Sequence, residues 1–432
     1  MTKKDKKNGS LKFSRRDFNS LLAGVAIGLK PKFSSASPNP KILIIGGGVG
    51  GTIVARHLLV SLPNAKIILV EPNKNYVTPF FTNQYLGGFK PLSDFTHNYE
   101  QLKHFKNLTI LQDTATYIDP ERAQVKFKRS SPMTYDSLVL APGTSPLFNR
   151  IKGYTEDTAD FLPHAYSITA SNQWLTLRNQ IKNMPNGGLL AITAPRRPYR
   201  CTPAPYERAS LIAKYLKNSK PRSKILILDS KNEFPLMDIV LELWRESYGE
   251  LIEWVSADFG GAIIAVDKKN KMLFSGDEKF QFNAANIIPP QTAGEIALNS
   301  GLTDKTGWCP VDGQTFESIL AKNIYILGDA INAGDMPKSA SAAVSQAKNV
   351  AISLEQAYGV LGNKYNELEN SCAFFTDTNS AVIVGGKYRV SNKKIVGVSG
   401  YSSEVGEEKS NLINNAKNSR LWYERFIRNA FS

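Results

Sequence analysis

Cysteine is scarce in this chain, with three in 432 residues: Cys201, Cys309 and Cys372. Three cysteines allow at most one disulfide within the chain and leave one thiol over. None belongs to a C-x-x-C-H motif, so the sequence contains no attachment site for a c-type haem. In an oxidising compartment we expect one pair to be oxidised, unless the reaction of the protein turns the pair over.

The apolar run near the N-terminus, residues 21–29, is too short to cross a bilayer. It follows a basic stretch that contains the Arg15-Arg16 pair, and it precedes the small residues Ser34, Ser35 and Ala36. This order is typical of a twin-arginine export signal, so we expect residues 1–36 to be a signal peptide and the protein to be periplasmic. An amphipathic surface helix is the alternative.

A clustered stripe of Lys and Arg is missing from the rest of the chain. Residues 1–36 hold nine Lys or Arg and two Asp, which leaves +8 of the formal net charge of +15. A mild, scattered positive charge favours simple solvation or an acidic partner and argues against nucleic-acid binding. The sequence also lacks repeats of solenoid length, and its 42% hydrophobic content predicts a globular protein of two or three domains.

Glycines gather directly after the first strongly apolar run. Residues 41–45 predict a buried strand, and Gly46, Gly48 and Gly51 follow as G-x-G-x-x-G before a helical pattern. Such glycines allow a tight turn, close approach to a pyrophosphate and packing of helix on strand. Glu71 lies twenty residues after Gly51, at the end of the second strand, where a carboxylate accepts hydrogen bonds from ribose. We therefore predict a dinucleotide site; a glycine-rich turn beside a surface glutamate is the alternative.

Two distant segments decide between NAD and FAD. Residues 136–144 resemble the strand and A-T-G/A-P-G turn of two-domain flavoprotein reductases, and residues 326–330 resemble the strand and G-D turn of the same proteins. That resemblance implies that Asp329 binds the ribityl chain of a flavin, for which an NAD dehydrogenase has no use. FAD is therefore the predicted cofactor. These turns contribute the predicted cofactor-binding residues Ala141, Pro142, Gly143, Gly328 and Asp329.

Glycine is absent from the second candidate nucleotide turn. Residues 189–193 predict another buried strand, but residues 194–198, with the sequence APRRP, follow it. Their side chains and fixed proline φ angles keep the backbone away from a pyrophosphate. We therefore expect a small electron donor in place of a nicotinamide. Cys201 lies three residues beyond this segment.

The alternation of predicted strands and helices indicates the α/β class, with two Rossmann-like domains of the glutathione-reductase type and a small α+β C-terminal domain. We expect the FAD-binding domain to be discontinuous. Further predicted strands are 135–141, 188–193, 224–229, 286–288 and 323–326. The expected divisions are 1–36 (signal), 37–151 with 291–361 (FAD-binding), 152–290 (Rossmann-like without a nucleotide site) and 362–432 (C-terminal interface domain).

The chain from residue 37 onward resembles the flavoprotein subunits of flavocytochrome c sulfide dehydrogenases, within the broader sulfide:quinone oxidoreductase group. The segment around Cys201 is specific to these proteins, whereas the glycines are not. The resemblance also implies cofactor contacts for Asn73, Ala115 and Lys338. The matching segments are 46–51 with 71–73, 200–210, 307–312, and 328–330 with 336–339.

The resemblance further implies that Cys201 and Cys372 form a redox disulfide against the flavin, with Glu207 as the acid-base carboxylate. Hydrosulfide would attack one sulfur, giving a persulfide and a thiolate whose electrons pass to the flavin. The two cysteines lie 171 positions apart, and this spacing alone leaves their contact open. A structural disulfide is the alternative. Cys309 is expected to be a buried structural thiol.

One departure from the family concerns the flavin linkage. The family attaches FAD covalently to a cysteine in the loop after Glu-Pro-Asn, and this chain has Pro79 at the aligned position. Proline cannot form the thioether, so we predict that FAD is held without a covalent bond.

The resemblance implies a small inorganic sulfur substrate, oxidised to sulfur or polysulfide, and a c-type cytochrome subunit as the electron acceptor. A membrane-surface sulfide:quinone oxidoreductase, with peripheral membrane contact, is one alternative. A non-catalytic sulfur-binding accessory flavoprotein is another. The moderately amphipathic stretch 411–431 fits either a docking surface or core. No metal site is predicted.

Overall fold

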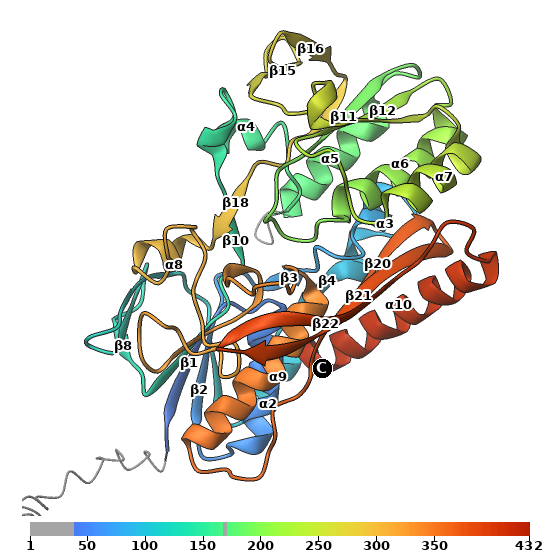
Figure 1. The fold of residues 1–432 in the computed structure, drawn as a ribbon. Coiled ribbons are helices and arrows are strands. Elements are labelled where there is room, and N and C mark those ends of the chain that lie inside the picture. Colours follow the sequence, from blue (N-terminus) through green and yellow to red (C-terminus); the bar gives the residue numbers. More distant parts are fainter. Residues whose placement is uncertain (1–38, 167–170) are drawn as a thin grey trace, which may run out of the picture. The chain divides into compact units, whose positions relative to one another are not determined.

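The computed structural model of the chain describes residues 39–166 and 171–432. The predicted export signal, residues 1–36, lies outside these residues. The chain from Pro38 to Ser432 forms one compact unit. This unit contains two parallel sheets with helices and a third, antiparallel sheet near the C-terminus (Figure 1).

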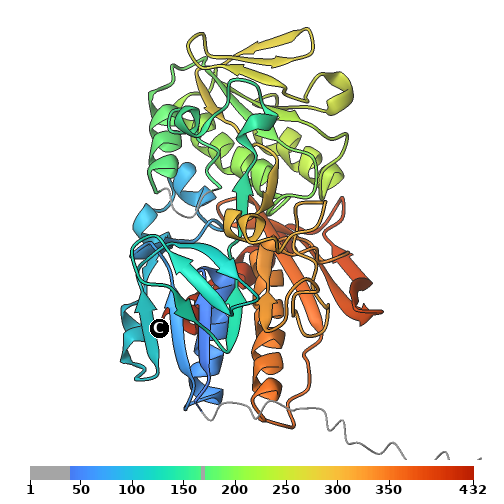
Figure 2. The ribbon, with the colours of Figure 1, turned by 90° about the vertical axis from the view of Figure 1, so that its left-hand side faces the viewer.

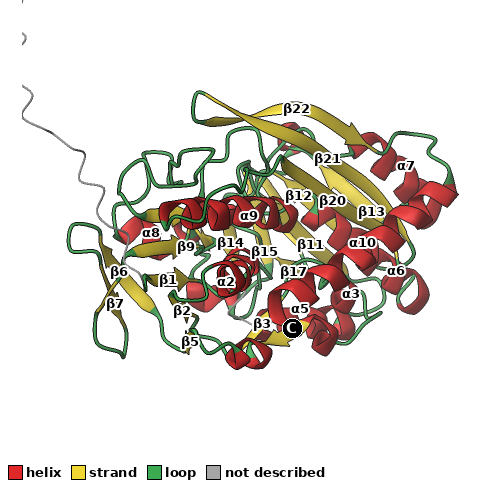
Figure 3. Cartoon of the chain, turned by 90° about the horizontal axis from the view of Figure 1, so that it is seen from below, coloured by secondary structure: helices red, strands yellow, loops and turns green. Residues whose placement is uncertain are grey.

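The first sheet is five-stranded and entirely parallel, with the order β19-β9-β1-β2-β5. Strand β1 is buried along nearly its whole length, as its KILII sequence predicts for a strand covered on both faces. Helices α2 (Val49–Ser61) and α9 (Ala340–Ala357) pack against each other beside this sheet (Figure 3). The strands are β1 (Lys41–Ile45), β2 (Lys66–Val70), β5 (Leu108–Leu111), β9 (Ser137–Leu140) and β19 (Ile324–Ile326).

Smaller elements connect the strands of the first sheet. An antiparallel sheet β6-β7-β8 lies between β5 and β9 in sequence, and helix α8 packs on β6. The elements are β3 (Asn75–Val77), α3 (Asn83–Leu86), β4 (Thr96–Asn98), β6 (Ala115–Asp119), β7 (Gln124–Phe127), β8 (Met133–Thr134) and α8 (Glu295–Asn299), with the 3-10 turns Leu92–Phe95, Glu100–His104 and Gly328–Ala330.

The second sheet is four-stranded and parallel, with the order β13-β12-β11-β17. It is joined to the first sheet by the antiparallel pair β10 (Thr144–Pro146) and β18 (Gln291–Ala293), along which the chain leaves and returns (Figure 2). Its elements are α4 (Glu156–Ala159), α5 (Ser171–Asn183), β11 (Leu189–Ala194), α6 (Ala204–Ser219), β12 (Lys224–Asp229), α7 (Met237–Tyr248), β13 (Ile252–Val255) and β17 (Ala284–Asn286). A hairpin sheet of β14 (Ala265–Asp267), β15 (Met272–Ser275) and β16 (Glu278–Gln281) adjoins it.

The C-terminal part consists of the antiparallel sheet β20 (Leu368–Asp377), β21 (Ser380–Ser391) and β22 (Lys394–Ser402), followed by helix α10 (Lys409–Phe431). Its apolar side chains are shared between the two larger cores. Phe374 packs with the core of the second sheet, whereas Phe426 packs with the core of the first. One face of the amphipathic stretch 411–431 belongs to the core, because it packs on β21 and α2. Ile413 and Leu421 on this helix remain exposed.

The predicted α/β class with two Rossmann-like domains and an α+β C-terminal portion is confirmed. One predicted strand is displaced, because the ladder ends at Asn286 although Ile287 and Ile288 are buried. The amide of Ile288 donates to the side-chain hydroxyl of Thr193 on β11 instead of to a main-chain carbonyl. Among the helices of residues 39–166 and 171–432, none is long and apolar enough to cross a membrane.

Candidate active site

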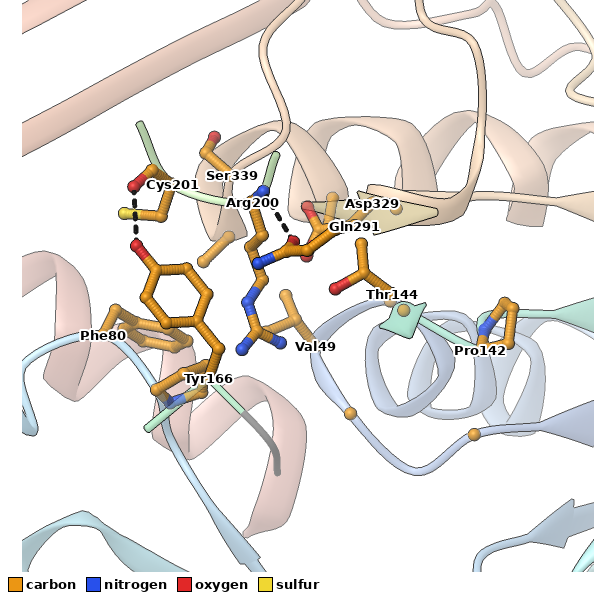
Figure 4. A pocket seen from close by; sticks show the side chains of 18 of the residues that line it. Val49, Phe80, Pro142, Thr144, Tyr166, Arg200, Cys201, Gln291, Asp329 and Ser339 are labelled. Atoms are coloured by element: carbon orange, nitrogen blue, oxygen red, sulfur yellow. Dashed lines mark hydrogen bonds between the residues drawn. The ribbon is translucent and has the colours of Figure 1, made fainter. Parts of the chain in front are cut away.

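A cavity of about 1260 Å³ lies where the two parallel sheets and the C-terminal sheet meet (Figure 4). Each of the three regions contributes to its wall, through Gly46, Cys201 and Cys372 respectively. Of the fifteen residues predicted from sequence, all line the cavity except Gly51 and Lys338. Strand ends at such a crevice are where α/β sheets bind ligands.

The glycine turn is built from close backbone approaches. Gly46 has a φ of +100°, and a Cβ there would lie 2.3 Å from the carbonyl oxygen of Ala141, in the second predicted cofactor turn. A Cβ at Gly51 would lie 1.9 Å from the carbonyl oxygen of Gly46. Gly51 therefore serves the packing of α2 against the turn, while Gly48 begins the helix and lines the cavity. The helix N-terminus faces the place where a pyrophosphate would bind.

The carboxylate of Glu71 is fixed at the end of β2. It accepts hydrogen bonds from the amide of Gly47 (2.9 Å) and from both the amide (3.0 Å) and the side-chain nitrogen (2.7 Å) of Asn73. Asn73 therefore orients Glu71 in addition to lining the cavity. A carboxylate held in this way beside the glycine turn is suited to accept from ribose hydroxyls.

Asp329 presents a buried oxygen, Oδ1, that has no hydrogen-bond partner among the described residues. Burial raises the pKa of this carboxyl, and the positive charges of Arg200 and Lys338 oppose the rise. A buried acceptor without a donor is costly, and the hydroxyls of a ribityl chain would satisfy it. The glycine turn, Glu71 and Asp329 together fit FAD.

Lys338 was predicted to contact the cofactor, but its side chain points elsewhere. Its ammonium donates to the main-chain carbonyls of Asp329 (2.9 Å) and Ile331 (2.6 Å) and lies over the ring of Trp308. Burial lowers the pKa of Lys338 to about 8. Lys338 therefore holds the Gly-Asp turn in place through two of its three ammonium donors, and it is not among the residues that line the cavity.

Cys201 lies in the turn before α6 with a φ of +53°, a left-handed conformation that is uncommon outside glycine. Its amide donates to the carbonyl of Lys338 (2.8 Å), which ties the turn to the Gly-Asp segment. Burial raises the pKa of the thiol well above its ordinary value, with a further rise from the nearby Cys372. Strained backbone of this kind gathers at functional sites.

Cys372 lies on β20 and faces the same cavity. Its sulfur lies 3.6 Å from Oδ1 of Asn370, and burial raises its pKa. All three cysteines are free thiols in this structure. The topology thus brings Cys201 and Cys372 to one cavity despite their separation in sequence, in the unbridged form. Cys309 is fully buried beside the Gly-Asp segment, away from the cavity.

Glu207 lies in the first turn of α6 and is 8% exposed. Its carboxylate accepts from Nδ2 of Asn83 (2.8 Å) and from the amide of Phe375 (3.3 Å) on the strand that carries Cys372. Burial raises the pKa of Glu207 to about 7. A carboxyl with this pKa exchanges protons readily near neutral pH.

Sequence reasoning missed the polar groups that support Glu207. Arg208, 1% exposed, donates to Oδ1 of Asn83 (3.1 Å), so that the amide nitrogen of Asn83 faces Glu207. Arg208 also donates to the carbonyls of His164 and Ala165. The position of Arg208 directly after Glu207 was the one available signal, since Asn83 comes from a segment more than 120 positions away.

The second sheet has closed the position where a nucleotide ribose would bind. Asp229 ends β12 as Glu71 ends β2, but it is fully buried and accepts from Tyr206, Lys231 and Trp254. The carboxylate oxygens of Asp229 therefore bond to side chains of the protein, whereas Glu71 faces the cavity. This arrangement agrees with the missing glycines of the preceding turn and leaves no open site for a nicotinamide nucleotide at this strand end.

Aromatic residues form the wall of the cavity near α10. Phe80 lies edge-on to Trp422 and Phe426, with ring centroids 5.8 and 5.4 Å apart. Pro79, the residue at the family's attachment position, lines the cavity next to Phe80. Tyr423 bonds to Thr78 and to His97, which fixes α10 on this loop.

Comparisons with known proteins agree with this arrangement. A family model described as the central part of the flavoprotein chain of sulfide dehydrogenase (flavocytochrome c) matches residues 175–289. The model for pyridine nucleotide-disulphide oxidoreductases matches residues 40–177.

Curated relatives are similar over much of the chain. The mitochondrial sulfide:quinone oxidoreductase of Dictyostelium discoideum is 27% identical over 81% of this chain and 78% of its own length. That of Mus musculus is 23% identical over 73% of this chain and 70% of its own. Among solved structures, the sulfide:quinone oxidoreductase from Aquifex aeolicus has a TM-score of 0.70 at 16% identity, covering 91% of this chain and 92% of that one.

The pyridine nucleotide-disulphide oxidoreductase model covers the glycine turn and Glu71, and the relatives are similar over most of the chain. The chain has the two-domain fold of these oxidoreductases and is similar in sequence to sulfide:quinone oxidoreductases.

Proposed function

We propose that the protein is an exported, FAD-dependent sulfide dehydrogenase that oxidises hydrosulfide to sulfur or polysulfide and passes electrons to a c-type cytochrome subunit. One observation carries the proposal: Cys201, Cys372 and Glu207 line the same cavity as the flavin-binding turns. The sulfide chemistry of the relatives supports the choice of substrate.

The reaction starts from the oxidised pair. Hydrosulfide attacks one sulfur of the bond between Cys201 and Cys372, which breaks; the attacked cysteine becomes a persulfide and the other leaves as a thiolate. A second hydrosulfide attacks the outer sulfur of the persulfide; the bond to the cysteine breaks, disulfane departs, and the cysteine that carried the persulfide becomes the second thiolate. Re-forming the disulfide from the two thiolates releases two electrons. FAD, when bound, supplies a two-electron acceptor for this step.

Glu207 is the proton acceptor in this scheme. Departing disulfane carries a proton that must be removed to leave the anionic product, and Glu207 lines the cavity where it is released. The Asn83 amide and the Phe375 backbone amide hold the carboxylate in one orientation. Burial brings its pKa to about 7, which matches that of a base working near neutral pH.

The electron acceptor and the location are tested together. Periplasmic export is supported by the order of basic, apolar and small residues in residues 1–36. We expect the native protein to be recovered from the periplasmic fraction together with a c-type haem protein, and sulfide to drive reduction of cytochrome c. Recovery from the cytoplasm, or reduction of a soluble quinone analogue without reduction of cytochrome c, would refute these parts of the proposal.

A sulfide:quinone oxidoreductase is the second candidate, because the relatives carry that name and because Phe80 and Trp422 give the cavity an apolar wall. The family model for the flavocytochrome c chain favours the cytochrome. The acceptor assay above separates the two.

We further propose that FAD is held without a covalent bond, since Pro79 offers no nucleophile. Acid precipitation of the purified protein should release the yellow flavin into the supernatant and leave a colourless pellet. Flavin retained in the washed pellet would show a covalent link at another residue.

A further inference from the structure

Arg200, the residue before Cys201, points its guanidinium into the cavity (Figure 4). Its backbone amide is fixed by Oε1 of Gln291 (3.1 Å), and its side chain is 6% exposed. The guanidinium lies 5.3 Å from the ring centre of Tyr166, whose hydroxyl donates to the carbonyl of Cys201 (3.4 Å). The protein therefore builds a fixed position for this side chain.

The guanidinium of Arg200 forms no ion pair among the described residues, although its charge acts on the buried Asp329 carboxyl. Nη2 is buried without a hydrogen-bond partner, and Arg200 takes part in none of the ion pairs found in residues 39–166 and 171–432. A guanidinium cannot lose its proton in a protein, so it remains charged. Keeping a buried charge unpaired is expensive, and an arriving anion removes that cost.

Asp329 lines the same cavity with an unpartnered oxygen of opposite sign, yet the two residues form no ion pair. Each is therefore free for a different ligand group. Asp329 accepts, which suits a hydroxyl, whereas Arg200 donates, which suits an anion.

We propose that Arg200 forms an anion-binding site that holds hydrosulfide, and then the anionic sulfur chain, beside Cys201. The inference rests on the proposed function for the identity of the anion. That reaction brings in two hydrosulfide anions, creates thiolates and leaves an anionic product, all at the cysteine that follows Arg200. A fixed cation at this point concentrates hydrosulfide and stabilises the leaving thiolate.

Alkylation of the reduced holoprotein tests the site without using its activity. Iodoacetate is an anion and iodoacetamide is neutral, so the ratio of their rates at Cys201, followed by peptide mass spectrometry, reports the positive charge around the thiol. We expect Arg200→Met to lower this ratio about tenfold. Arg197→Met removes the same charge from the exposed part of the same turn and should leave the ratio unchanged. Arg200→Lys, which keeps the positive charge, should restore most of the wild-type ratio.

Equal ratios in Arg200→Met and Arg197→Met would overturn the proposal. An unchanged ratio combined with a lowered flavin midpoint potential in Arg200→Met would also overturn it, because Arg200 would then serve the flavin. Should Arg200→Met fail to fold, thiocyanate added to the wild-type protein must reduce the preference for iodoacetate, and a constant preference would refute the site. Failure of sulfide to bleach the wild-type flavin would refute the proposed function alone, since alkylation does not depend on turnover.

Discussion

Sulfide should fail to bleach the flavin absorbance of a Cys201→Ser variant. Serine cannot form the disulfide that hydrosulfide attacks, so the rate of flavin reduction is expected to fall about 10³-fold or more. Stopped-flow absorbance with purified holoprotein measures this directly. Flavin content should stay at the wild-type level, because Cys201 belongs to the turn before α6 and the flavin-binding turns lie on the first sheet.

The matched control is Cys309→Ser, which changes the same atom in a thiol that lies outside the cavity. Bleaching should survive in this variant, although the buried hydroxyl lowers its stability. Undiminished bleaching in Cys201→Ser would exclude the disulfide mechanism. A protein that binds sulfur at Cys201 but shows slow bleaching even in the wild type would point to the accessory role instead.

Glu207→Gln should reduce turnover by about 10²–10⁴-fold, the usual contribution of a positioned base. Below its pKa of about 7 the Glu207 carboxyl is protonated and cannot accept a proton, so wild-type turnover should rise with pH through this range. Glutamine has nearly the same shape but cannot titrate, and its single oxygen accepts only one of the two hydrogen bonds that Glu207 accepts from Asn83 and Phe375. The pH-dependent rise should therefore disappear along with the rate. The measurement is the pH profile of kcat with sulfide.

Stability provides an independent readout for the same residue. The folded protein binds the Glu207 proton more tightly than the unfolded chain does, since its pKa is raised from 4.5 to about 7. The stabilising contribution of the Glu207 proton to the free energy of unfolding is therefore fully present below pH 4.5 and is lost as the pH rises towards 7. Thermal unfolding of Glu207→Gln should lack this decline. An identical pH dependence in both proteins would contradict a titrating Glu207.

The sequence predicted those parts of the candidate site that depend on a short run of residues with fixed spacing. The glycine turn after 41–45 and the strand-turn at 326–330 have fixed spacing, because one backbone conformation must meet one phosphate or one ribityl group. The fold class and the placement of Asp329 and Glu207 at the cavity could be expected from such segments.

The missed features depend on long-range geometry instead. Asn83 reaches Glu207 only because α3 packs on α6, and the open donor of Arg200 is visible only once its surroundings are known. The contacts of Lys338 with the Gly-Asp turn were also beyond the sequence, because a motif gives the position of a residue but not the direction of its side chain. Strand β17 ends at Asn286, before the predicted end at Ile288. The apolar pattern did not indicate this, because Ile287 and Ile288 are buried without being paired in the ladder.

Packing of the C-terminal sheet has a further consequence for the proposed disulfide chemistry. A bond between Cys201 and Cys372 closes a loop of about 170 residues, and its loss releases about 5 kcal/mol of chain entropy to the unfolded state. Phe374 and Val382, on strands β20 and β21, are embedded in the core of the second sheet. These non-covalent contacts anchor the strand that carries Cys372 to the second sheet. In the proposed reaction they would keep Cys372 at the cavity with Cys201 while the covalent link is open.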